Sequence, residues 1–215
     1  MPHHQFPSTY VYWESLKDHD ELKAKYMPII DKIERDRPGD LETVSGTCTL
    51  KFRSYDRDYV INNFLEPRDI NRIIWNPLDN FIEEINSKYQ RKIEVKDSIV
   101  DGYWFNTYDK YDNQEMHDHN ANIRIKNGEE YHPIFSGIYI LNDENESSSI
   151  IFRTYEVPFR PLLEPYTFFT SDMSDIKEGT VIIFPTPLLH MVSKCIKPGR
   201  RTIAFNIFSS VCGSE

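Results

Sequence analysis

From residue 98 onward the chain is broken up by turn signals, and this spacing constrains the fold more than any other feature. Segments rich in β-branched and aromatic residues alternate with turn clusters such as Asn127-Gly128 and Lys197-Pro198-Gly199. Many short strands with such punctuation predict an all-β sandwich or barrel. The expected strands are residues 99–107, 119–125, 137–141, 149–155, 180–184, 191–194 and 202–209.

The first 97 residues follow a helical pattern instead. Apolar residues recur at helical spacing over residues 22–33 and again over residues 78–89. Pro28 interrupts the first run, which predicts a kink or two short helices. Asn76-Pro77 is typical of an N-cap followed by proline at the first helical position, and residues 47–53 alternate well enough for a strand.

These patterns predict a mainly β fold with N-terminal helices. We expect a single domain over residues 1–215. A helical part over residues 1–97 would pack on one sheet of a β core that spans residues 98–212.

The composition disfavours several classes of partner. With 25 Lys and Arg against 34 Asp and Glu, the net charge is −9, which disfavours nucleic acid. No run approaches the roughly 18 apolar residues that span a membrane, and the first residues lack the pattern of a secretory signal. We therefore expect a cytoplasmic protein without a membrane partner, in the host cytoplasm if a phage encodes it, and we leave a homo-oligomer open.

Two histidines separated by one residue, His117 and His119, form the first candidate for a metal site. In a strand, residues two apart face the same side, so both imidazoles would enter one pocket and Asp118 would point away. Imidazole suits iron, zinc, copper and nickel, so the ligand type does not name the metal. The alternative is a solvated loop, because the segment is very polar.

His190 is the third candidate ligand. It follows a continuous apolar run at residues 180–184 and a proline-bearing segment that would turn the chain back into the barrel. The alternative is a hydrogen-bonded core histidine.

On the inner face of the last strand lie Arg200, Thr202, Ala204 and Asn206, which bring a guanidinium, a hydroxyl and an amide to that face. The other face is largely apolar and can pack on the helices. Arginine grips a carboxylate through two parallel hydrogen bonds, and the Thr202 hydroxyl can add a third. The alternative for Arg200 is a surface salt bridge at the start of a strand.

Six short segments, taken in order, form a recognisable pattern. They are Trp104-Phe105-Asn106, His117-x-His119, residues 136–141, residues 179–185, His190-x-Val192 and residues 200–206. This pattern resembles the 2-oxoglutarate- and iron(II)-dependent oxygenases of the double-stranded β-helix superfamily, especially a subgroup common in marine bacteria and in phages of cyanobacteria. The resemblance covers roughly residues 98–210 and implies a jelly-roll, cupin-like barrel.

The resemblance also implies roles for single residues. His117 and His190 would be two of the iron ligands. Arg200 and Thr202 would hold the distal carboxylate of 2-oxoglutarate. Two further residues would line the pocket near the co-substrate, Tyr139 and Asn106.

The third metal ligand departs from the wider superfamily, which has Asp or Glu two residues after the first histidine. This chain has His119 there, as members of the close subgroup often do. Three neutral imidazoles leave the site one unit more positive than two imidazoles and a carboxylate, and the charges of a keto acid would offset the metal. Asp118 is the alternative if a bulge rotates the strand, and His132 is a more distant candidate.

The activity that the resemblance implies is a dioxygenase that uses iron(II), 2-oxoglutarate and O2 to hydroxylate an unidentified substrate, with release of succinate. The expected substrate is a protein or peptide side chain, with prolyl hydroxylation as the nearest chemistry. Residues 156–178 would form a substrate lid, because loops of that length are usually functional, and the alternative is structural packing across the barrel. Two alternatives stay open: a three-histidine, cupin-like metalloenzyme that does not use 2-oxoglutarate, and a non-catalytic β-barrel accessory or structural protein of a phage.

Overall fold

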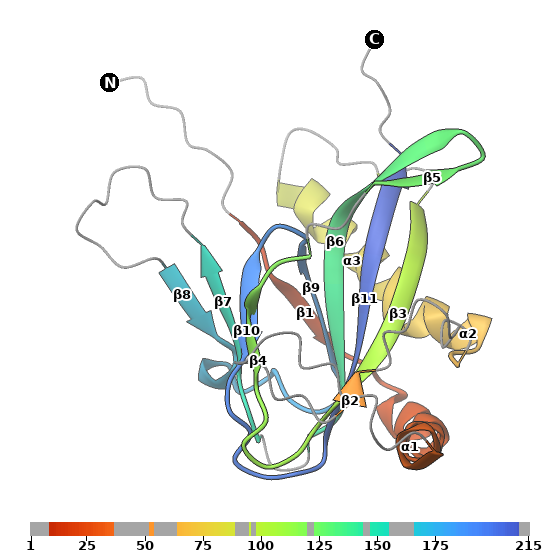
Figure 1. Ribbon diagram of the computed structural model, residues 1–215. Coiled ribbons are helices and arrows are strands. Elements are labelled where there is room, and N and C mark those ends of the chain that lie inside the picture. Colours follow the sequence, from red (N-terminus) through yellow and green to blue (C-terminus); the bar gives the residue numbers. More distant parts are fainter. Residues whose placement is uncertain are drawn as a thin grey trace, which may run out of the picture.

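Two antiparallel sheets face each other in this protein, whose structure is a computed structural model (Figure 1). Within the described residues, the larger sheet has seven strands and the smaller sheet has four. The structure describes residues 9–36, 52–53, 64–88, 95, 98–119, 123–143, 147–154 and 166–210.

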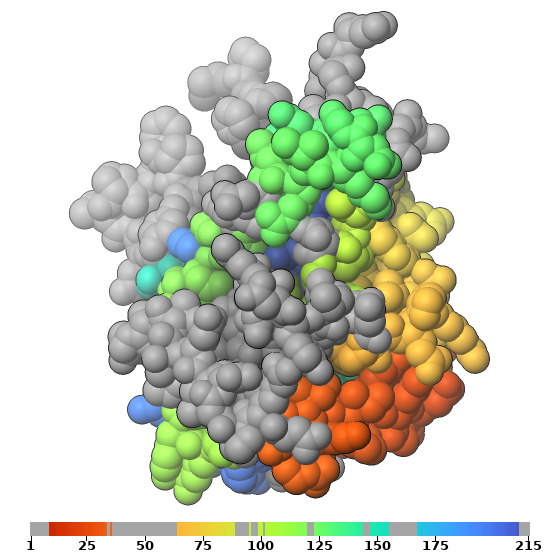
Figure 2. Space-filling model, turned by 45° about the vertical axis from the view of Figure 1, so that its right-hand side comes forward, coloured from red at the N-terminus to blue at the C-terminus, as the bar shows by residue number. Residues whose placement is uncertain are grey.

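The larger sheet is built around two long strands, β6 (Glu129–Asn142) and β11 (Arg200–Ser210), which pair along most of their length. From one edge to the other, the order is β1 (Tyr12–Ser15), β9 (Thr180–Pro185), β6, β11, β3 (Ser98–Tyr108) and β2 (Phe52–Arg53). A further short strand, β5 (Arg124–Lys126), pairs with β6. It forms a hairpin that projects from the top of the molecule in Figure 2.

The smaller sheet contains only short strands. Its order is β4 (Gln114–His117), β10 (Leu189–Val192), β7 (Ile150–Thr154) and β8 (Tyr166–Phe169). The chain crosses repeatedly between the two sheets, so that neighbouring strands come from distant parts of the sequence. This arrangement is the double-stranded β-helix, as the sequence predicts.

Apolar side chains from both sheets fill the space between them. Ile138, Ile182 and Phe184 come from the larger sheet, and Ile150 and Phe152 come from the smaller one. All five are buried, and they form one cluster. The site described below lies in the polar remainder of this interior.

Helices cover the outer face of the larger sheet. They are α1 (His19–Asp36), α2 (Pro67–Ile70), a π-helical turn (Asn71–Trp75) and α3 (Asn76–Lys88); a short 3-10 helix (Thr170–Asp172) follows β8. Figure 2 shows α1 and α3 together on one flank. They pack on the outward residues of β11, Ile203, Phe205 and Ile207, so the predicted two-faced character of this strand is confirmed.

The helices differ from the sequence predictions at both prolines. Helix α1 runs through Pro28 as one helix, so the alternative of two short helices is wrong. Asn76 has helical backbone angles inside a continuous helical segment and is not an N-cap. The π-helical turn directly before Pro77 widens the backbone where the proline ring would otherwise clash with the preceding turn.

Two predicted strands differ from the observed ones where the structure describes them. Of the strand expected over residues 119–125, residues 120–122 lie outside the described residues, β4 ends at His117, and Arg124 and Ile125 belong to β5. Strand β10 begins at Leu189, two residues earlier than expected, and thus includes His190. Of the strand expected over residues 47–53, only β2 lies within the described residues.

The expected lid is only partly visible. Residues 156–165 lie outside the described residues, and Tyr166–Phe169 form strand β8, which pairs with β7. In the part of the chain that the structure describes, none of the helices is long and apolar enough to cross a membrane.

Candidate metal and anion site

The three candidate histidines converge between the two sheets. The nitrogen atoms with which His117, His119 and His190 could bind a metal all lie within 4.8 Å of one another. The Nε2 atoms of His117 and His119 are 3.2 Å apart. Two nitrogens bound at about 2.1 Å and at right angles to each other would be about 3.0 Å apart, so this pair is nearly at ligand spacing.

Strand pairing explains how two of the histidines meet. His117 at the end of β4 lies opposite His190 in β10, although 73 residues separate them in the sequence. His119 follows the end of β4, and its backbone N–H donates to the carbonyl of Thr186. The expectation that a continuous strand aligns His117 and His119 is therefore wrong, yet the two imidazoles still converge.

Each imidazole is held by its Nδ1 atom. His117 Nδ1 lies 2.8 Å from the carbonyl of Glu115, and His190 Nδ1 lies 3.0 Å from the carbonyl of Leu188. His119 Nδ1 lies 2.8 Å from the Asn206 side-chain oxygen. A carbonyl oxygen only accepts hydrogen bonds, so each Nδ1 carries the proton and each Nε2 keeps its lone pair.

Burial keeps His190 neutral. The pKa of His190 lies well below its usual value of 6.5, first because of desolvation and then because His117 and His119 would repel its positive charge. A metal binds the neutral form of imidazole, so His190 is in the ligating form at neutral pH. Three lone pairs that face one another in this way repel each other unless a cation lies between them.

The other candidate ligands lie away from this point. Asp118 is exposed, and the register shift in the β4–β10 pairing lies on the other side of His117, between His117 and Gln114. His132 is half-buried near Glu130, with 3.7 Å between Nε2 and the carboxylate.

Arg200 forms the second half of the site. Its side chain is 1% exposed, and Nη1 donates to the carboxylate of Asp143 and to the carbonyl of Ser148. Its Nε and Nη2 atoms find no hydrogen-bond partner among the described residues. These two atoms form the edge of the guanidinium that grips a carboxylate with two parallel bonds.

A chain of contacts connects Arg200 to helix α1. Glu178 accepts a hydrogen bond of 2.7 Å from the backbone N–H of Asp143, and its other oxygen contacts Lys23 and His19 of α1 at 2.6 and 3.1 Å. Desolvation would raise the pKa of Glu178, but these donors outweigh it and hold the pKa below 4.5. The hydrogen bond from the Asp143 N–H to Glu178 thus helps to hold Asp143 beside Arg200.

A small cavity joins the two halves of the site. Its lining includes the three histidines, Arg200, and three further polar residues: Asn106, Gln114 and Thr202. The cavity has a volume of about 10 Å³, which is room for about one water molecule. A larger ligand therefore requires the lining side chains to move apart.

Tyr139 is the predicted site residue that the structure places elsewhere. It lies on the outer face of β6, is fully buried under α1, and its hydroxyl is 2.7 Å from His19 Nδ1. Strand β6 alternates sides, so Tyr139 points away from the cavity while its neighbour Ile138 lines it. The expectation that Tyr139 lines the co-substrate pocket is thus wrong.

Residues that the sequence analysis passed over complete the site. Gln114, Asp143 and Glu178 each contact a predicted site residue or its support. Asp143 and Glu178 lie in turn regions that carry no motif, so the sequence offers no signal for them. Asn206, in contrast, was placed on the inner face of the last strand by the sequence pattern, and it contacts His119 there.

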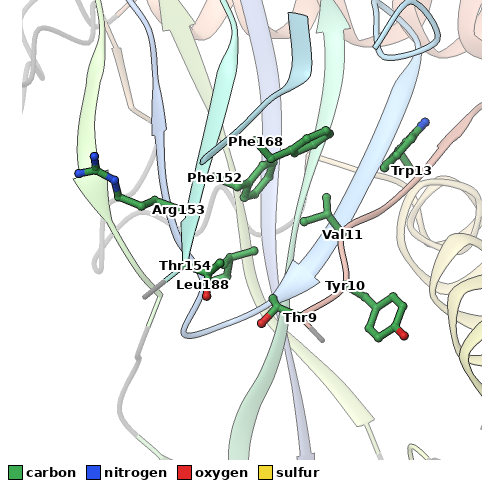
Figure 3. A pocket seen from close by; sticks show the side chains of 9 residues that line it. All are labelled: Thr9, Tyr10, Val11, Trp13, Phe152, Arg153, Thr154, Phe168 and Leu188. Atoms are coloured by element: carbon green, nitrogen blue, oxygen red, sulfur yellow. The ribbon is translucent and has the colours of Figure 1, made fainter. Parts of the chain in front are cut away.

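A second cavity has a volume of about 250 Å³, and Figure 3 shows the side chains that line it. Its walls include Trp13, Phe152 and Phe168, whose rings are stacked at centroid distances of 5.9 and 6.1 Å. The ring of Phe152 also lies 6.0 Å from that of His190. One aromatic side chain therefore separates this cavity from a candidate metal ligand.

Of the three comparisons with known proteins, the one with solved structures found similar proteins. No family model matches the sequence, and no curated protein matches it either. The structure of HygX from Streptomyces hygroscopicus with nickel and 2-oxoglutarate bound matches with a TM-score of 0.57 and 11% identity. The match covers 96% of this chain and 85% of that one.

Two other solved structures are similar. AviO1 from Streptomyces viridochromogenes Tue57 has a TM-score of 0.56 and 12% identity, with 96% of this chain and 92% of that chain covered. A prolyl hydroxylase from Trichoplax adhaerens, in complex with a peptide fragment of the hypoxia inducible factor oxygen degradation domain, has a TM-score of 0.51 and 11% identity. That match covers 93% of this chain and 83% of the hydroxylase. At these identities the comparisons establish a shared fold.

We expect Asp143→Ala to lower the free energy of unfolding by about 3 kcal/mol, because it leaves the buried charge of Arg200 without a partner. Chemical denaturation measures this change. The double variant Asp143→Ala/Arg200→Leu should recover part of the loss, since it removes both charges. Asp175→Ala, which removes an exposed hydrogen bond to Trp13, is the control and should cost less than about 1 kcal/mol. Equal losses in the single and double variants would contradict the buried pair.

Proposed function

We propose that this protein is an iron(II)- and 2-oxoglutarate-dependent oxygenase that hydroxylates a C–H bond of its substrate. His117, His119 and His190 would hold the metal, and Arg200 with Thr202 would hold the distal carboxylate of the co-substrate. The observation that carries this proposal is the meeting of three imidazole lone pairs, each fixed by a bond at Nδ1. Without a cation between them this arrangement is repulsive, and with one it is a ligand set.

Arg200 and the residues around it support the proposal that the co-substrate is a keto acid with two carboxylates. The free edge of Arg200 is buried, positively charged and able to form two hydrogen bonds, which suits a carboxylate. Thr202 and Asn106 line the same cavity and are also buried, and the Asn106 side-chain oxygen has no partner among the described residues. One dicarboxylic acid can contact both the metal and Arg200 only if the cavity widens, as its present volume indicates.

The protein's own residues would bind, orient and exclude water. When bound, iron(II), 2-oxoglutarate and O2 would supply the oxidative decarboxylation of the keto acid to succinate and the oxidation of a substrate C–H bond. The neutral histidines would leave the positive charge of the metal available to the anionic co-substrate. The apolar cluster around His190, with Phe152 and Phe184 in ring contact, would keep bulk water away from the metal.

We expect the protein, loaded anaerobically with iron(II), to bind about one metal ion per chain. His117→Ala and His190→Ala should each weaken binding on the order of 100-fold or more, because each removes a ligand. Metal analysis after gel filtration, together with competition against a chelator, measures the affinity. His132→Ala is the matched control and should bind metal normally, since His132 lies outside the cluster. Negligible metal in all four proteins would favour the non-catalytic β-barrel alternative.

For the co-substrate, we expect Arg200→Gln to raise the Kd of 2-oxoglutarate about 100-fold, which corresponds to about 2.7 kcal/mol for a lost bidentate ion pair. Anaerobic titration of the iron(II) protein, followed by its visible charge-transfer band, measures this Kd. The wild type should bind 2-oxoglutarate far better than pyruvate, which lacks the distal carboxylate, and the variant should lose that preference. Arg153→Gln on β7 is the control.

A wild-type protein that binds iron but shows no response to 2-oxoglutarate would favour the three-histidine metalloenzyme instead. Arg200→Lys refines the test, because it keeps the charge but loses the planar fork. An affinity between those of the wild type and the glutamine variant would support bidentate binding.

For the substrate, we propose an uncharged side chain of a protein or peptide, such as a prolyl ring. The aromatic cavity next to His190 supports this choice, because stacked rings suit an apolar ring of this size. We expect proline-containing peptides to gain one oxygen atom when incubated with the iron-loaded protein and 2-oxoglutarate, as measured by mass spectrometry. Oxidation of free small molecules with no peptide product would contradict this class.

A further inference from the structure

Gln114 occupies a place in the site that none of the proposed ligands or anchors fills. It is the first residue of β4, three positions before His117, and its side chain is 9% exposed. It lines the same small cavity as the three histidines and Arg200. Its side-chain nitrogen lies 3.1 Å from His117 Nε2, the atom that faces the candidate metal position.

The orientation of the Gln114 amide is fixed from both ends. His117 donates its Nδ1 proton to the carbonyl of Glu115, so its Nε2 can only accept, and the Gln114 NH2 group must be the donor. At the other end, the hydroxyl of Tyr108 donates to the Gln114 side-chain oxygen at 3.2 Å. The NH2 group is therefore aimed at the metal-facing edge of the cluster.

A bound metal would take away the acceptor that this amide uses. The lone pair of His117 cannot serve both the metal and the Gln114 NH2 group. A buried amide that loses its acceptor is costly to leave unsatisfied, so binding of the metal creates a demand for a new acceptor at this point. An anionic oxygen beside the metal meets that demand.

We propose that Gln114 is a co-substrate-binding residue, whose amide donates a hydrogen bond to the metal-bound end of the keto acid. This inference rests on the function proposed above. A neutral donor suits this position, because it strengthens the hold on an anionic oxygen without competing for the metal.

Tyr108 connects this amide to the other end of the site. The guanidinium carbon of Arg200 lies 6.0 Å from the centre of the Tyr108 ring, while the Tyr108 hydroxyl holds Gln114. Tyr108 is 1% exposed and lines the cavity beside both residues. The pair Tyr108 and Gln114 thus forms a wall that runs from the anion anchor to the histidines, along the path that a dicarboxylic acid would take.

The test compares metal affinity with 2-oxoglutarate affinity in Gln114→Leu, which keeps the size of the side chain and removes the amide. We expect its iron(II) affinity to stay within about threefold of the wild type. The Kd of 2-oxoglutarate should rise about tenfold, equivalent to about 1.4 kcal/mol, and the charge-transfer band of the anaerobic complex should shift. Asn80→Leu, which removes an exposed side-chain amide of α3, is the matched control.

Two further variants keep the proposal falsifiable if the leucine variant folds poorly. Tyr108→Phe should also raise the Kd of 2-oxoglutarate, but by a smaller factor. The Gln114 amide stays in place and loses only the hydrogen bond that orients it. Gln114→Glu should bind iron more tightly and 2-oxoglutarate more weakly than the wild type, since a carboxylate attracts the cation and repels the anion.

The outcomes separate this proposal from the proposed function. Wild-type Kd values and an unshifted band in Gln114→Leu would overturn the role of Gln114 and leave the oxygenase proposal intact. Loss of iron binding in Gln114→Leu as severe as in His117→Ala would also overturn it, because the amide would then support the ligand rather than the keto acid. A wild-type protein that never binds 2-oxoglutarate would instead contradict the oxygenase proposal itself.

Discussion

The site depends on three imidazole lone pairs that the fold holds close together although they repel one another. Each Nδ1 of His117, His119 and His190 is committed to an oxygen acceptor, so the lone pairs of the three Nε2 atoms are directed toward one another. The surrounding fold holds them together in spite of this, through the β4–β10 pairing and the Asn206 side chain. In the proposed function a cation would relieve this repulsion, and an anion would satisfy the guanidinium edge of Arg200.

The two halves of the site differ in how their charge is balanced. Arg200 is already neutralised by Asp143, which is itself fixed by Glu178 and the N–H of Ser147. Among the described residues, the group that converges on the candidate metal position contains three histidines and no carboxylate. Negative charge from a bound diacid would therefore matter most at the metal end, while at Arg200 it would mainly satisfy directed hydrogen bonds.

The sequence predicted the barrel and most of the inner site, because both follow from short-range patterns. Alternation along the last strand separates Arg200, Thr202 and Asn206 from the apolar residues that meet the helices, and this strand is regular enough for the rule to hold. Tyr139 was predicted on the wrong face of β6, because the sequence motif marks its position along the strand but does not indicate the face on which its side chain lies.

Interactions between distant segments could not be predicted in this way. Asp143 reaches Arg200 across 57 residues of sequence. Gln114 and His117 are only three residues apart, but their contact depends on the irregular pairing of β4 with the distant strand β10. The π-helical turn before Pro77 shows the same limit, since local preference predicted a new helix there and the widened turn preserved a continuous one. Such features arise from tertiary packing, which overrides local propensity.

Strand β4 ends at His117, so the side chain at position 119 can change without affecting the pairing of the strands. His119 is positioned by a backbone contact to Thr186 and by the Asn206 amide, outside the hydrogen-bonded ladder that fixes the barrel. Exchange of this ligand for an acidic residue would thus leave strand registers untouched. In the proposed metal site, a change of this side chain and its amide support would alter the charge of the ligand set while the architecture stays constant.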